Sequence, residues 1–359
     1  MRAAVFSSGK FAVENVPEPR PAAGQILVRP LVCGICGSDL HTRHHAHHLG
    51  ALFQRAGFKG FMSPDKPVVM GHEFCCEVLD YGPGCRRTVP KGERIVGLPF
   101  LNGPEGMVLL GYSNSYYGGF AEQMVLQEDC TFAVPDHVPT DVAALAEPLS
   151  VAVHAVAAAN PGPDAAYVVY GCGPVGLGVI ARLSFLGYGP ILAVDPDPAR
   201  RAFAEKMGAH VVMAPSSAAV CRWWEEQGAP IGVSDAAAAK GAGLAGRRPV
   251  IFECVGKAGL LKAVSEEAPA GASIIVVGVC MSPDTIEPSF DVLKEFVLRF
   301  VFAYTVPEFV EATRMIEADP QRFAPFVTGH TNLEGITGAF DLLEKGGSQA
   351  KLLISPDRR

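Results

Sequence analysis

The chain has 359 residues, which is too long for one ordinary hydrophobic core and predicts two domains, or three at most. Hydrophobic residues make up 49% of it and charged residues 19%, with a mean hydropathy of +0.23, so disorder is excluded for most of its length. The formal net charge of -7 and the pI of about 5.8 argue against a surface for nucleic acid or an anionic membrane, since either needs a basic face.

The cellular setting is indicated by what the sequence lacks. The segment MRAAVFSSGKFAVENV has neither the basic start nor the continuous apolar core of a secretion signal. No stretch approaches the roughly 18 uninterrupted apolar residues of a membrane span. The ten cysteines are scattered, several of them inside apolar runs, which indicates reduced thiols more than a disulfide framework. We therefore expect a soluble protein of the cytoplasm.

Residues 1–147 have the pattern of a β-rich domain. Short runs that are apolar, or that alternate apolar and polar residues, are separated by glycine and proline, as expected of strands joined by turns. The expected strands are RAAVF, FAVENV, QILVRPLV, CCEVLDYG, ERIVGL and FAEQMVL. Such a segment predicts a compact domain, either a partly closed barrel or a sandwich.

Two polar motifs in this domain contain residue types that zinc prefers. Cys36 belongs to CGSDLH, which follows an apolar strand, and His72 belongs to GHE further along the chain. A catalytic zinc takes three protein ligands and keeps one position open, and Glu147, in LAEPLS, is the candidate third ligand. A thiolate, a carboxylate and an imidazole would make the site about neutral with zinc bound, which suits stabilisation of an alkoxide.

Each of these residues also has an ordinary interpretation. Cys36 alone would more often be a small buried residue, and His72 a hydrogen-bonded turn residue. Glu147 could begin a helix, where the dipole favours an acid. Only their combination argues for a metal site.

The segment after CGSDLH is rich in histidine and phenylalanine. It contains His44, His45, His47, His48, Phe53, Phe58 and Phe61. As a loop, residues 41–61 could line a substrate pocket or close over it, and together with Tyr112, Tyr116 and Tyr117 they suggest apolar walls with some capacity to bind hydroxyls. A solvated histidine cluster on a surface loop is at least as good an interpretation, so these histidines are assigned no role.

From about residue 148 the pattern becomes that of parallel α/β architecture. After the apolar helical run VAALAEPLSVAVHAVAAAN, strands and helices alternate as AAYVVYG, PVGLGVIARLSFLG, ILAVD and PARRAFAEKMG. Further strands are PVIFECVG, SIIVVGV and RFVFAY, and such near-continuous apolar runs are typical of parallel strands buried on both faces. Residues 148–304 are therefore expected to form a doubly wound parallel sheet.

The segment after the first of these strands fits the strand, G-x-G-x-x-G, helix pattern of dinucleotide-binding folds. Gly171 allows the tight turn, Gly173 lets a pyrophosphate approach the backbone, and Gly176 lets the helix pack against the strand. The start of that helix offers unpaired N–H groups to the phosphates. Asp195 ends the next strand, 19 residues after Gly176, where a carboxylate binds the ribose 2′-hydroxyl.

The acid at position 195 favours NAD over NADP, because a carboxylate would repel a 2′-phosphate. Asp195 could also cap the helix that begins at Pro196, and the two roles are compatible. Arg200 and Arg201 lie in the first turns of that helix, where one of them, Arg200 in our assignment, would cover the adenosine side of the cofactor, although a solvated helix face explains them nearly as well.

The rest of the chain has two further features. Residues 228–246, GAPIGVSDAAAAKGAGLAG, look like an inserted loop of small residues with no functional explanation. The tail contains the helices PEFVEATRMIEAD and ITGAFDLLEKG and a final strand, AKLLISP, that could complete the first domain.

The motifs GICGSDLH, GHE, AEPLSVAVHAV and FDLLEKG, together with the glycine loop, resemble those of the zinc-dependent medium-chain alcohol and polyol dehydrogenases, such as the sorbitol and threonine dehydrogenases. The resemblance runs over almost the whole chain. It implies a GroES-like catalytic domain, residues 1–147 completed by 305–359, and a Rossmann NAD-binding domain, residues 148–304.

The resemblance also implies a zinc site. Cys36 and His72 would bind the catalytic zinc. Glu147 stands where relatives place Cys, Asp or Glu, and Glu73 is an alternate ligand or lies just outside the ligand set.

By the same comparison, other residues would handle protons and the cofactor. Ser38 would be the proton-relay hydroxyl, and His41 its outlet toward solvent. Asp39 would accept the other ring N–H of His72. Val175, in the glycine loop, would help to place the nicotinamide.

The sequence departs from the family in its metal content. Many relatives hold a second, structural zinc through four closely spaced cysteines after the GHE motif, but no cysteine lies between Glu93 and Gln127. We therefore expect one catalytic zinc per chain and no structural zinc.

The activity implied is the reversible, NAD-linked oxidation of a secondary alcohol or polyol to a carbonyl compound. The alternatives are an NAD(P)H-dependent carbonyl or enoyl reductase of a biosynthetic pathway and a non-catalytic nucleotide-binding protein. The joint presence of all the site residues argues against the last. A homodimer or homotetramer is expected, as is usual in the family, because a strand such as SIIVVGV could continue a sheet across a subunit boundary.

Overall fold

The computed structural model describes residues 1–58, 60–103, 106–244, 246–347 and 349–358. The chain divides into two compact units, which we call the terminal unit (Met1–Pro148 with Phe309–Arg359) and the central unit (Leu149–Glu308). The sequence predicts a catalytic domain of residues 1–147 with 305–359 and a nucleotide-binding domain of residues 148–304. That domain assignment stays a prediction.

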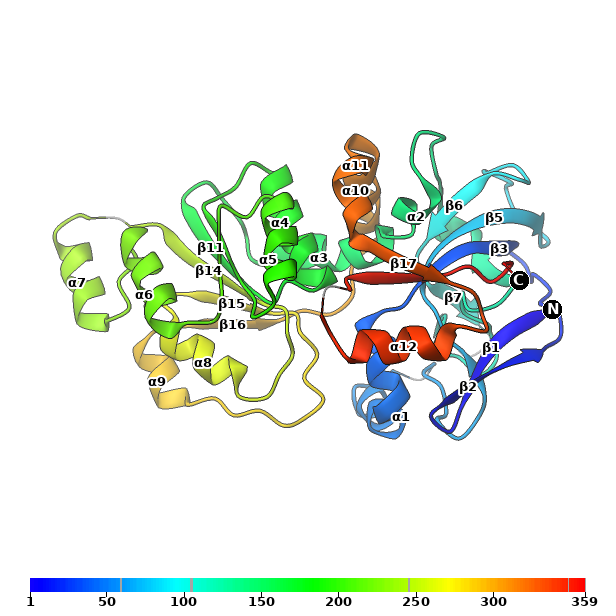
Figure 1. Ribbon diagram of the computed structural model, residues 1–359, viewed down its shortest axis with the longest axis horizontal. Coiled ribbons are helices and arrows are strands. Elements are labelled where there is room, and N and C mark those ends of the chain that lie inside the picture. The colour runs from blue at the N-terminus through cyan, green and yellow to red at the C-terminus, as the bar shows by residue number, and fades with distance from the viewer. Residues whose placement is uncertain (59, 104–105, 245, 348, 359) are drawn as a thin grey trace. The chain divides into compact units, whose positions relative to one another are not determined.

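The terminal unit is built mainly on antiparallel strands (Figure 1). Its strands are β1 (Arg2–Ser7), β2 (Lys10–Asn15), β3 (Gln25–Gly34), β4 (Val68–Val69), β5 (Glu73–Tyr81), β6 (Arg94–Gly97), β7 (Phe100–Gly103), β8 (Gly106–Leu109), β9 (Met124–Gln127), β10 (Thr131–Ala133), β17 (Val327–Thr331) and β18 (Lys351–Ile354). The main sheet has the order β10-β6-β5-β3-β18-β17, with β9 also paired to β3. The strands β2-β1-β4 form a separate three-stranded sheet, and β7 and β8 form a two-stranded one.

Of the twelve strands described in this unit, the sequence pattern finds seven and misses five. The expected strands are present as β1, β2, β3, β5, β6, β9 and, for the final run AKLLISP, β18. The strands β4, β7, β8, β10 and β17 were not expected, because their two to five residues show no clear alternation of apolar and polar residues.

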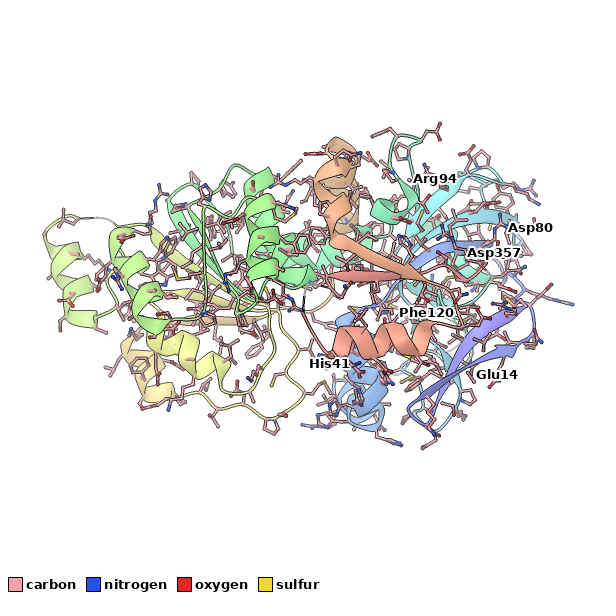
Figure 2. All side chains as sticks on the ribbon, in the orientation of Figure 1. Glu14, His41, Asp80, Arg94, Phe120 and Asp357 are labelled. Carbon is pink, nitrogen blue, oxygen red and sulfur yellow. The ribbon has the colours of Figure 1, made fainter. Side chains whose placement is uncertain are left out.

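Residues from both ends of the sequence share the core of the terminal unit. Strand β18 pairs antiparallel with β3, through Leu353 opposite Gly34, and parallel with β17. The helices of this unit are α1 (Gly37–Arg55), α2 (Thr140–Ala143), α11 (Pro320–Phe323) and α12 (Ile336–Glu344), with 3₁₀ turns at Glu128–Cys130 and Ala324–Phe326. Phe340 of α12 is fully buried, and the centroid of its ring lies 6.3 Å from that of Phe120. Phe120 is labelled in Figure 2.

The histidine-rich segment is not the loop that the sequence suggested. Most of residues 41–61 belongs to α1, which has a kink at His45. The helix begins at a stable turn, because Oδ2 of Asp39 accepts the N–H of Cys36 at 2.9 Å. Its buried residues are only Asp39, Thr42 and Leu49, so it has no apolar stripe from which a helix could have been predicted.

The central unit is a parallel sheet with helices on both faces (Figure 1). Its strands are β11 (Ala165–Tyr170), β12 (Ile191–Val194), β13 (Val211–Met213), β14 (Arg248–Glu253), β15 (Ser273–Val276) and β16 (Val297–Phe300), in the order β13-β12-β11-β14-β15-β16. Its helices are α4 (Pro174–Phe185), α5 (Pro198–Lys206), α6 (Ser217–Glu226), α7 (Val233–Gly241), α8 (Leu260–Glu267) and α9 (Pro288–Leu293). Every residue of β11 is buried, as expected of a central parallel strand covered on both faces.

Two expectations for this unit were wrong. Residues 228–246 are not simply a loop, because the alanine-rich run within them forms α7, as the high helix propensity of alanine allows; residue 245 lies outside the described residues. The strand SIIVVGV, seen as β15, cannot continue the sheet into another subunit, because it already pairs with β14 and β16. The edge strand on that side is β16, which ends at Phe300, earlier than the run RFVFAY suggested.

Two helices carry the chain from one unit to the other, α3 (Ala146–Ala158) and α10 (Val306–Ala318). The run Thr140–Ala158, which joins α2 and α3, is by length and composition apolar enough to cross a membrane, although Asp141 and Glu147 interrupt it. However, 72% of it is buried within the structure, as in a helix that packs into a protein core.

Candidate active site and cofactor loop

The pairing of β3 with β5 brings the two predicted metal motifs together. The strands are antiparallel, with Gly34 opposite Glu73. Cys36 lies just beyond the end of β3, and His72 just before the start of β5. The two side chains therefore leave the paired strands at the same end.

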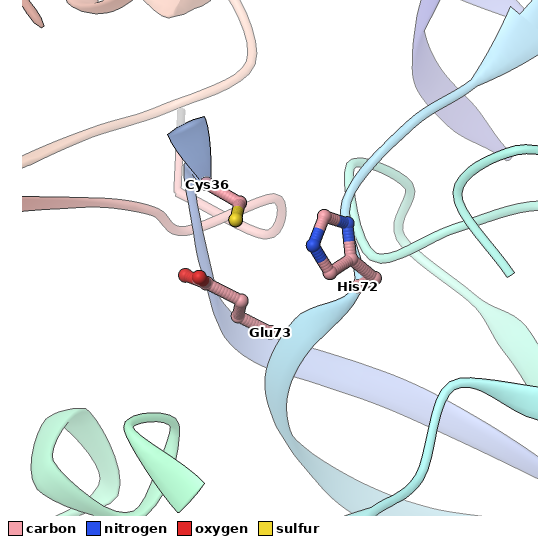
Figure 3. A group of neighbouring side chains, drawn as sticks. All are labelled: Cys36, His72 and Glu73. Carbon is pink, nitrogen blue, oxygen red and sulfur yellow. The ribbon is translucent and has the colours of Figure 1, made fainter. Parts of the chain in front are cut away.

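Cys36, His72 and Glu73 form a group of possible metal ligands (Figure 3). One ligand atom from each residue lies within 4.8 Å of the others, and His72 and Glu73 are buried. Among the residues that the structure describes, this is the group of three that could hold an ion. Sulfur, imidazole nitrogen and carboxylate oxygen are donors that zinc accepts.

Glu147, the third ligand expected from the sequence, is not part of this group. It lies in the first turn of α3 and is only 9% exposed. Its negative charge acts on Lys351 and contributes to a raised pKa of that lysine.

Lys351 is a site residue that the sequence analysis missed. Its Nζ donates to both carboxylate oxygens of Glu73, at 2.6 and 2.7 Å, and to the carbonyl oxygen of Ile35 at 3.1 Å. Burial alone would lower the pKa of Lys351, but the charge of Glu73 raises it above the usual lysine value. The available signal was a single lysine in the apolar strand AKLLISP, since an unpaired lysine is almost never fully buried.

The carboxylate of Glu73 reaches the site because residue 34 is glycine. A Cβ atom at Gly34 would overlap Oε2 of Glu73 and would also lie 3.2 Å from Cδ of Lys351. A larger residue here would push the ion pair away from Cys36.

A second set of polar contacts surrounds Ser38, the second residue of α1. Its Oγ lies 3.4 Å from Nε2 of His72. The hydroxyl of Tyr112 donates to Oγ of Ser38 at 2.8 Å and lies 3.3 Å from Oδ1 of Asp39. Burial, together with the charge of Asp39, raises the pKa of Tyr112 well above its usual value, so this hydroxyl keeps its proton.

The expected contact between Asp39 and His72 is longer than a hydrogen bond. Nδ1 of His72 lies 3.5 Å from Oδ1 of Asp39, and this buried nitrogen has no hydrogen-bond partner. Burial alone would lower the pKa of His72, but the charge of Asp39 raises it well above its usual value. A metal ion competes with that proton for the ring, so metal uptake is coupled to proton release.

His41 lies on α1 three residues after Ser38 (Figure 2). Burial, and then the charge of His45, lower the pKa of His41. Within the described part of the chain it makes no hydrogen bond to Ser38, so its role as a proton outlet stays a prediction.

The glycine loop after β11 has the geometry of a phosphate-binding turn. Gly171 has φ +92, and a Cβ atom at Gly176 would overlap the carbonyl oxygen of Gly171, so the turn and the close helix approach both require glycine. Gly173 differs, because a Cβ atom there would meet nothing within 4 Å. Gly173 is the N-cap of α4, so packing does not require glycine there although helix capping favours it, and a ligand that approaches the backbone would require it. Val175 lies half-buried in the first turn of α4.

Asp195 is buried directly after β12 and holds the loop in place. Its Oδ2 accepts the N–H of Cys172 at 2.8 Å, and its Oδ1 accepts the N–H of Asp197 at 2.8 Å. It does not cap the following helix as one interpretation suggested, because Asp197 is the N-cap of α5 and accepts the N–H groups of Ala199 and Arg200. Each carboxylate oxygen has a second acceptor position, so Asp195 can still bind a ribose hydroxyl.

A cavity of about 480 Å³ lies at the carboxyl ends of β14 and β15. Buried Glu253 lines it and accepts the N–H groups of Val255 and Gly256 at 2.7 and 2.8 Å. Burial raises the pKa of Glu253, and these two hydrogen bonds oppose the shift. Ligands of open parallel sheets bind outside the carboxyl ends of the strands, which is where this cavity lies.

Comparisons with known proteins agree on one family. The family model of the alcohol dehydrogenase GroES-like domain matches residues 22–136, and that of zinc-binding dehydrogenases matches residues 174–318. The expected fold class, a GroES-like β-rich domain with a Rossmann-type doubly wound sheet, is confirmed.

Individual relatives match over nearly the whole chain. The (R,R)-butanediol dehydrogenase of Bacillus subtilis (strain 168) is 29% identical over 377 residues, covering 99% of this chain and 100% of its own. The sorbitol dehydrogenase of Macaca fascicularis is 27% identical over 369 residues, covering 98% of this chain and 95% of its own. The crystal structure of 2R,3R-butanediol dehydrogenase from Bacillus subtilis has a TM-score of 0.78 and 27% identity, with 99% of each chain covered.

The two glycines of the loop predict different variant behaviour. Gly173→Ala should lose no more than about 1 kcal/mol of unfolding free energy, since alanine is a poorer N-cap of α4, but at least about tenfold in NAD affinity, because the methyl group occupies the space through which a pyrophosphate approaches. Gly176→Ala should lose NAD affinity and also about 1–3 kcal/mol of unfolding free energy, since α4 must move away from β11. Titration calorimetry measures the NAD affinity, and urea unfolding measures the free energy of unfolding. Wild-type NAD affinity in Gly173→Ala would contradict the assignment of Gly173 to the pyrophosphate.

The buried ion pair predicts a large effect on stability. Lys351→Met leaves the buried carboxylate of Glu73 without its cation, so unfolding free energy at neutral pH should fall by about 3–5 kcal/mol in metal-free protein. Adding Glu73→Gln should restore part of the loss. The control is Lys345→Met, an exposed lysine at the end of α12, which should leave the urea midpoint unchanged. Equal stabilities of Lys351→Met and the control would show that the pair is not needed.

Proposed function

Because the chain belongs to the zinc-dependent medium-chain alcohol and polyol dehydrogenases, we propose that it catalyses the reversible, NAD-linked oxidation of a secondary alcohol in a small diol or polyol. The observation that carries this proposal is the convergence of Cys36, His72 and Glu73 beside the hydroxyl of Ser38. The family resemblance of the sequence is confirmed by the two family models.

The residues present fit a zinc ion. Three donors of the types that zinc binds lie together, and the buried Nδ1 of His72 faces a carboxylate, as is usual for a zinc-bound imidazole. When bound, zinc supplies the Lewis acid that acidifies the alcohol, and NAD supplies the acceptor for the hydride.

We propose Cys36 and His72 as two of the zinc ligands and keep two candidates for the third. Glu73 lies in the observed group, but Lys351 holds both of its oxygens. Glu147 is the ligand that the family resemblance implies, so we assign it as the third ligand and Glu73 as the alternate one.

The protein's own task in the reaction is to place and move a proton. Ser38 is suited to accept the proton of the alcohol, because its Oγ lies 3.4 Å from Nε2 of His72 and so beside the proposed metal. His41, on the next turn of the same helix, is the proposed outlet toward solvent.

The cofactor assignment rests on the loop and on the acid that follows the second strand. Gly173 would let the pyrophosphate approach the start of α4, with Gly171 forming the turn and Gly176 allowing the helix to pack closely. Asp195 would bind the ribose hydroxyls of NAD and repel a 2′-phosphate. Val175 would contact the nicotinamide half, and Arg200, in the first turn of α5, the adenosine half.

We also propose a homodimer or homotetramer in the cytoplasm. The support for self-association is the edge strand β16, on which Val297 and Phe300 are 56% and 67% exposed. None of the ten cysteines forms a disulfide, which suits a reducing compartment.

A substrate panel tests the activity. Purified protein should reduce NAD with 2,3-butanediol, sorbitol or xylitol, and its kcat/KM should be at least about tenfold lower with NADP, because Asp195 disfavours a 2′-phosphate. Primary alcohols of the same length serve as the comparison. No turnover of any secondary alcohol with either cofactor would refute the proposal.

Elemental analysis tests the zinc assignment. The wild type should hold one zinc per chain, and Cys36→Ser and Glu147→Gln should lose it on dialysis because each removes a ligand. Glu73→Gln should retain zinc if it is only the alternate ligand. The reverse pattern, with zinc kept in Glu147→Gln and lost in Glu73→Gln, would exchange the two roles, and two zinc ions in the wild type would reveal a structural site.

A further inference from the structure

We infer that Tyr112 is a positioning residue for the proton-relay serine, and that the phenylalanines of the histidine-rich segment hold Tyr112 in place. This inference deepens the proposed function and rests on it, because it assumes that Ser38 handles the proton of the alcohol. It also gives a purpose to a segment for which the sequence offered no role.

The contacts of Tyr112 place its hydroxyl on Ser38. Its Oη donates to Oγ of Ser38 at 2.8 Å, whereas Oδ1 of Asp39 lies further away, at 3.3 Å. A phenol has one proton to donate, so the shorter contact takes it. The ring is 5% exposed and lies 5.3 Å from the ring of His72.

This hydrogen bond fixes how the oxygen of Ser38 is used. A hydroxyl has one proton and two acceptor positions. Tyr112 occupies one acceptor position, which leaves the other for the proton of the alcohol and leaves the proton of Ser38 free to pass onward. Tyr112 itself neither gains nor loses a proton, so it acts through Ser38 and not on the substrate.

The backbone of Ser38 is held as well. Oγ1 of Thr42, one turn further along α1, donates to the carbonyl oxygen of Ser38 at 2.8 Å, and Thr42 is fully buried. The hydroxyl of Ser38 therefore meets Tyr112 from a fixed position on the helix.

A column of aromatic rings leads from α1 to Tyr112. The rings of Phe53 and Phe61 stack at 4.1 Å with an interplanar angle of 9°. The rings of Phe61 and Tyr112 stack at 5.3 Å with an angle of 18°. Phe58 packs edge-on against Phe53 at 5.5 Å. Stacked rings have few ways to rotate, so the column limits the positions open to the hydroxyl of Tyr112.

The backbone beside Tyr112 is fixed against the metal motif. Gly111 has φ +83, and a Cβ atom there would lie 3.0 Å from the carbonyl oxygen of Gly71, the residue before His72. The tyrosine and the proposed zinc ligand therefore belong to two loops in close contact.

The test removes the hydroxyl and keeps the ring. Tyr112→Phe should lower kcat for the secondary alcohol by about tenfold, the worth of one hydrogen bond, with little change in the KM values for alcohol and NAD. The solvent deuterium isotope effect on kcat should rise, because a poorly oriented proton transfer becomes more rate-limiting. Zinc content and the unfolding temperature should match the wild type.

The matched control is Tyr81→Phe, which removes a tyrosine hydroxyl of the same unit that donates to the carbonyl oxygen of Val89 and not to Ser38, so kcat and the isotope effect should stay unchanged. A second variant, Phe61→Leu, opens the aromatic column and keeps the hydroxyl, and it should lower kcat in the same direction as Tyr112→Phe.

A double-mutant cycle with Ser38→Ala separates positioning from a structural effect. In the Ser38→Ala background, Tyr112→Phe should have no further effect on kcat, because the residue through which it acts is gone. The inference would be overturned if the double variant lost kcat by the product of the two single losses, or if Tyr112→Phe alone left kcat unchanged. Either result would leave the dehydrogenase assignment intact. A wild type inactive toward every secondary alcohol would overturn the proposed function and the inference together.

Discussion

The candidate site depends on the position of β3 between two partner strands. Its pairing with β5 sets Gly34 opposite Glu73, and its pairing with β18 sets Leu353 opposite the same glycine. Side chains alternate along a strand, so a shift of one residue in either register would turn the ligands to the other face of the sheet. The metal donors and the cation that neutralises one of them are thus placed by backbone hydrogen bonds made in the core.

The parts of this arrangement that were predictable from the sequence are those written in local patterns. Seven strands of the terminal unit, the parallel sheet, the glycine loop, and Cys36 with His72 could be inferred from alternation, apolar runs and motif spacing. A single lysine in an apolar strand could have marked Lys351 as a buried, paired residue, but its partner could not be inferred, because Glu73 lies 278 residues away and no local pattern encodes that distance. Helix α1 was also missed, since it buries few apolar residues and is secured by the hydrogen bond of Asp39 to its first turn.

The central unit shows how one motif can serve both the fold and a ligand. Gly176 is required by the packing of α4 on β11, whereas Gly173 faces open space. Asp195 combines the two requirements, because it ties the loop to the next turn through two N–H groups and retains acceptor positions for a ribose. The sequence motif does not distinguish Gly173, Gly176 and Asp195 by role. Their contacts in the structure show which of them the packing requires and which a bound cofactor would explain.

The long span of the Glu73–Lys351 pair has a consequence for synthesis on the ribosome. After Glu73 emerges, 278 further residues must be added before its cation exists. At typical translation rates of about 5–20 residues per second, this takes roughly 15 to 60 s. During that time the side of β3 that will receive β18 is an open strand edge, and such edges pair readily with other chains. We therefore expect chaperones to bind the first segment of the terminal unit, Met1–Pro148, until its second segment, Phe309–Arg359, has been synthesised.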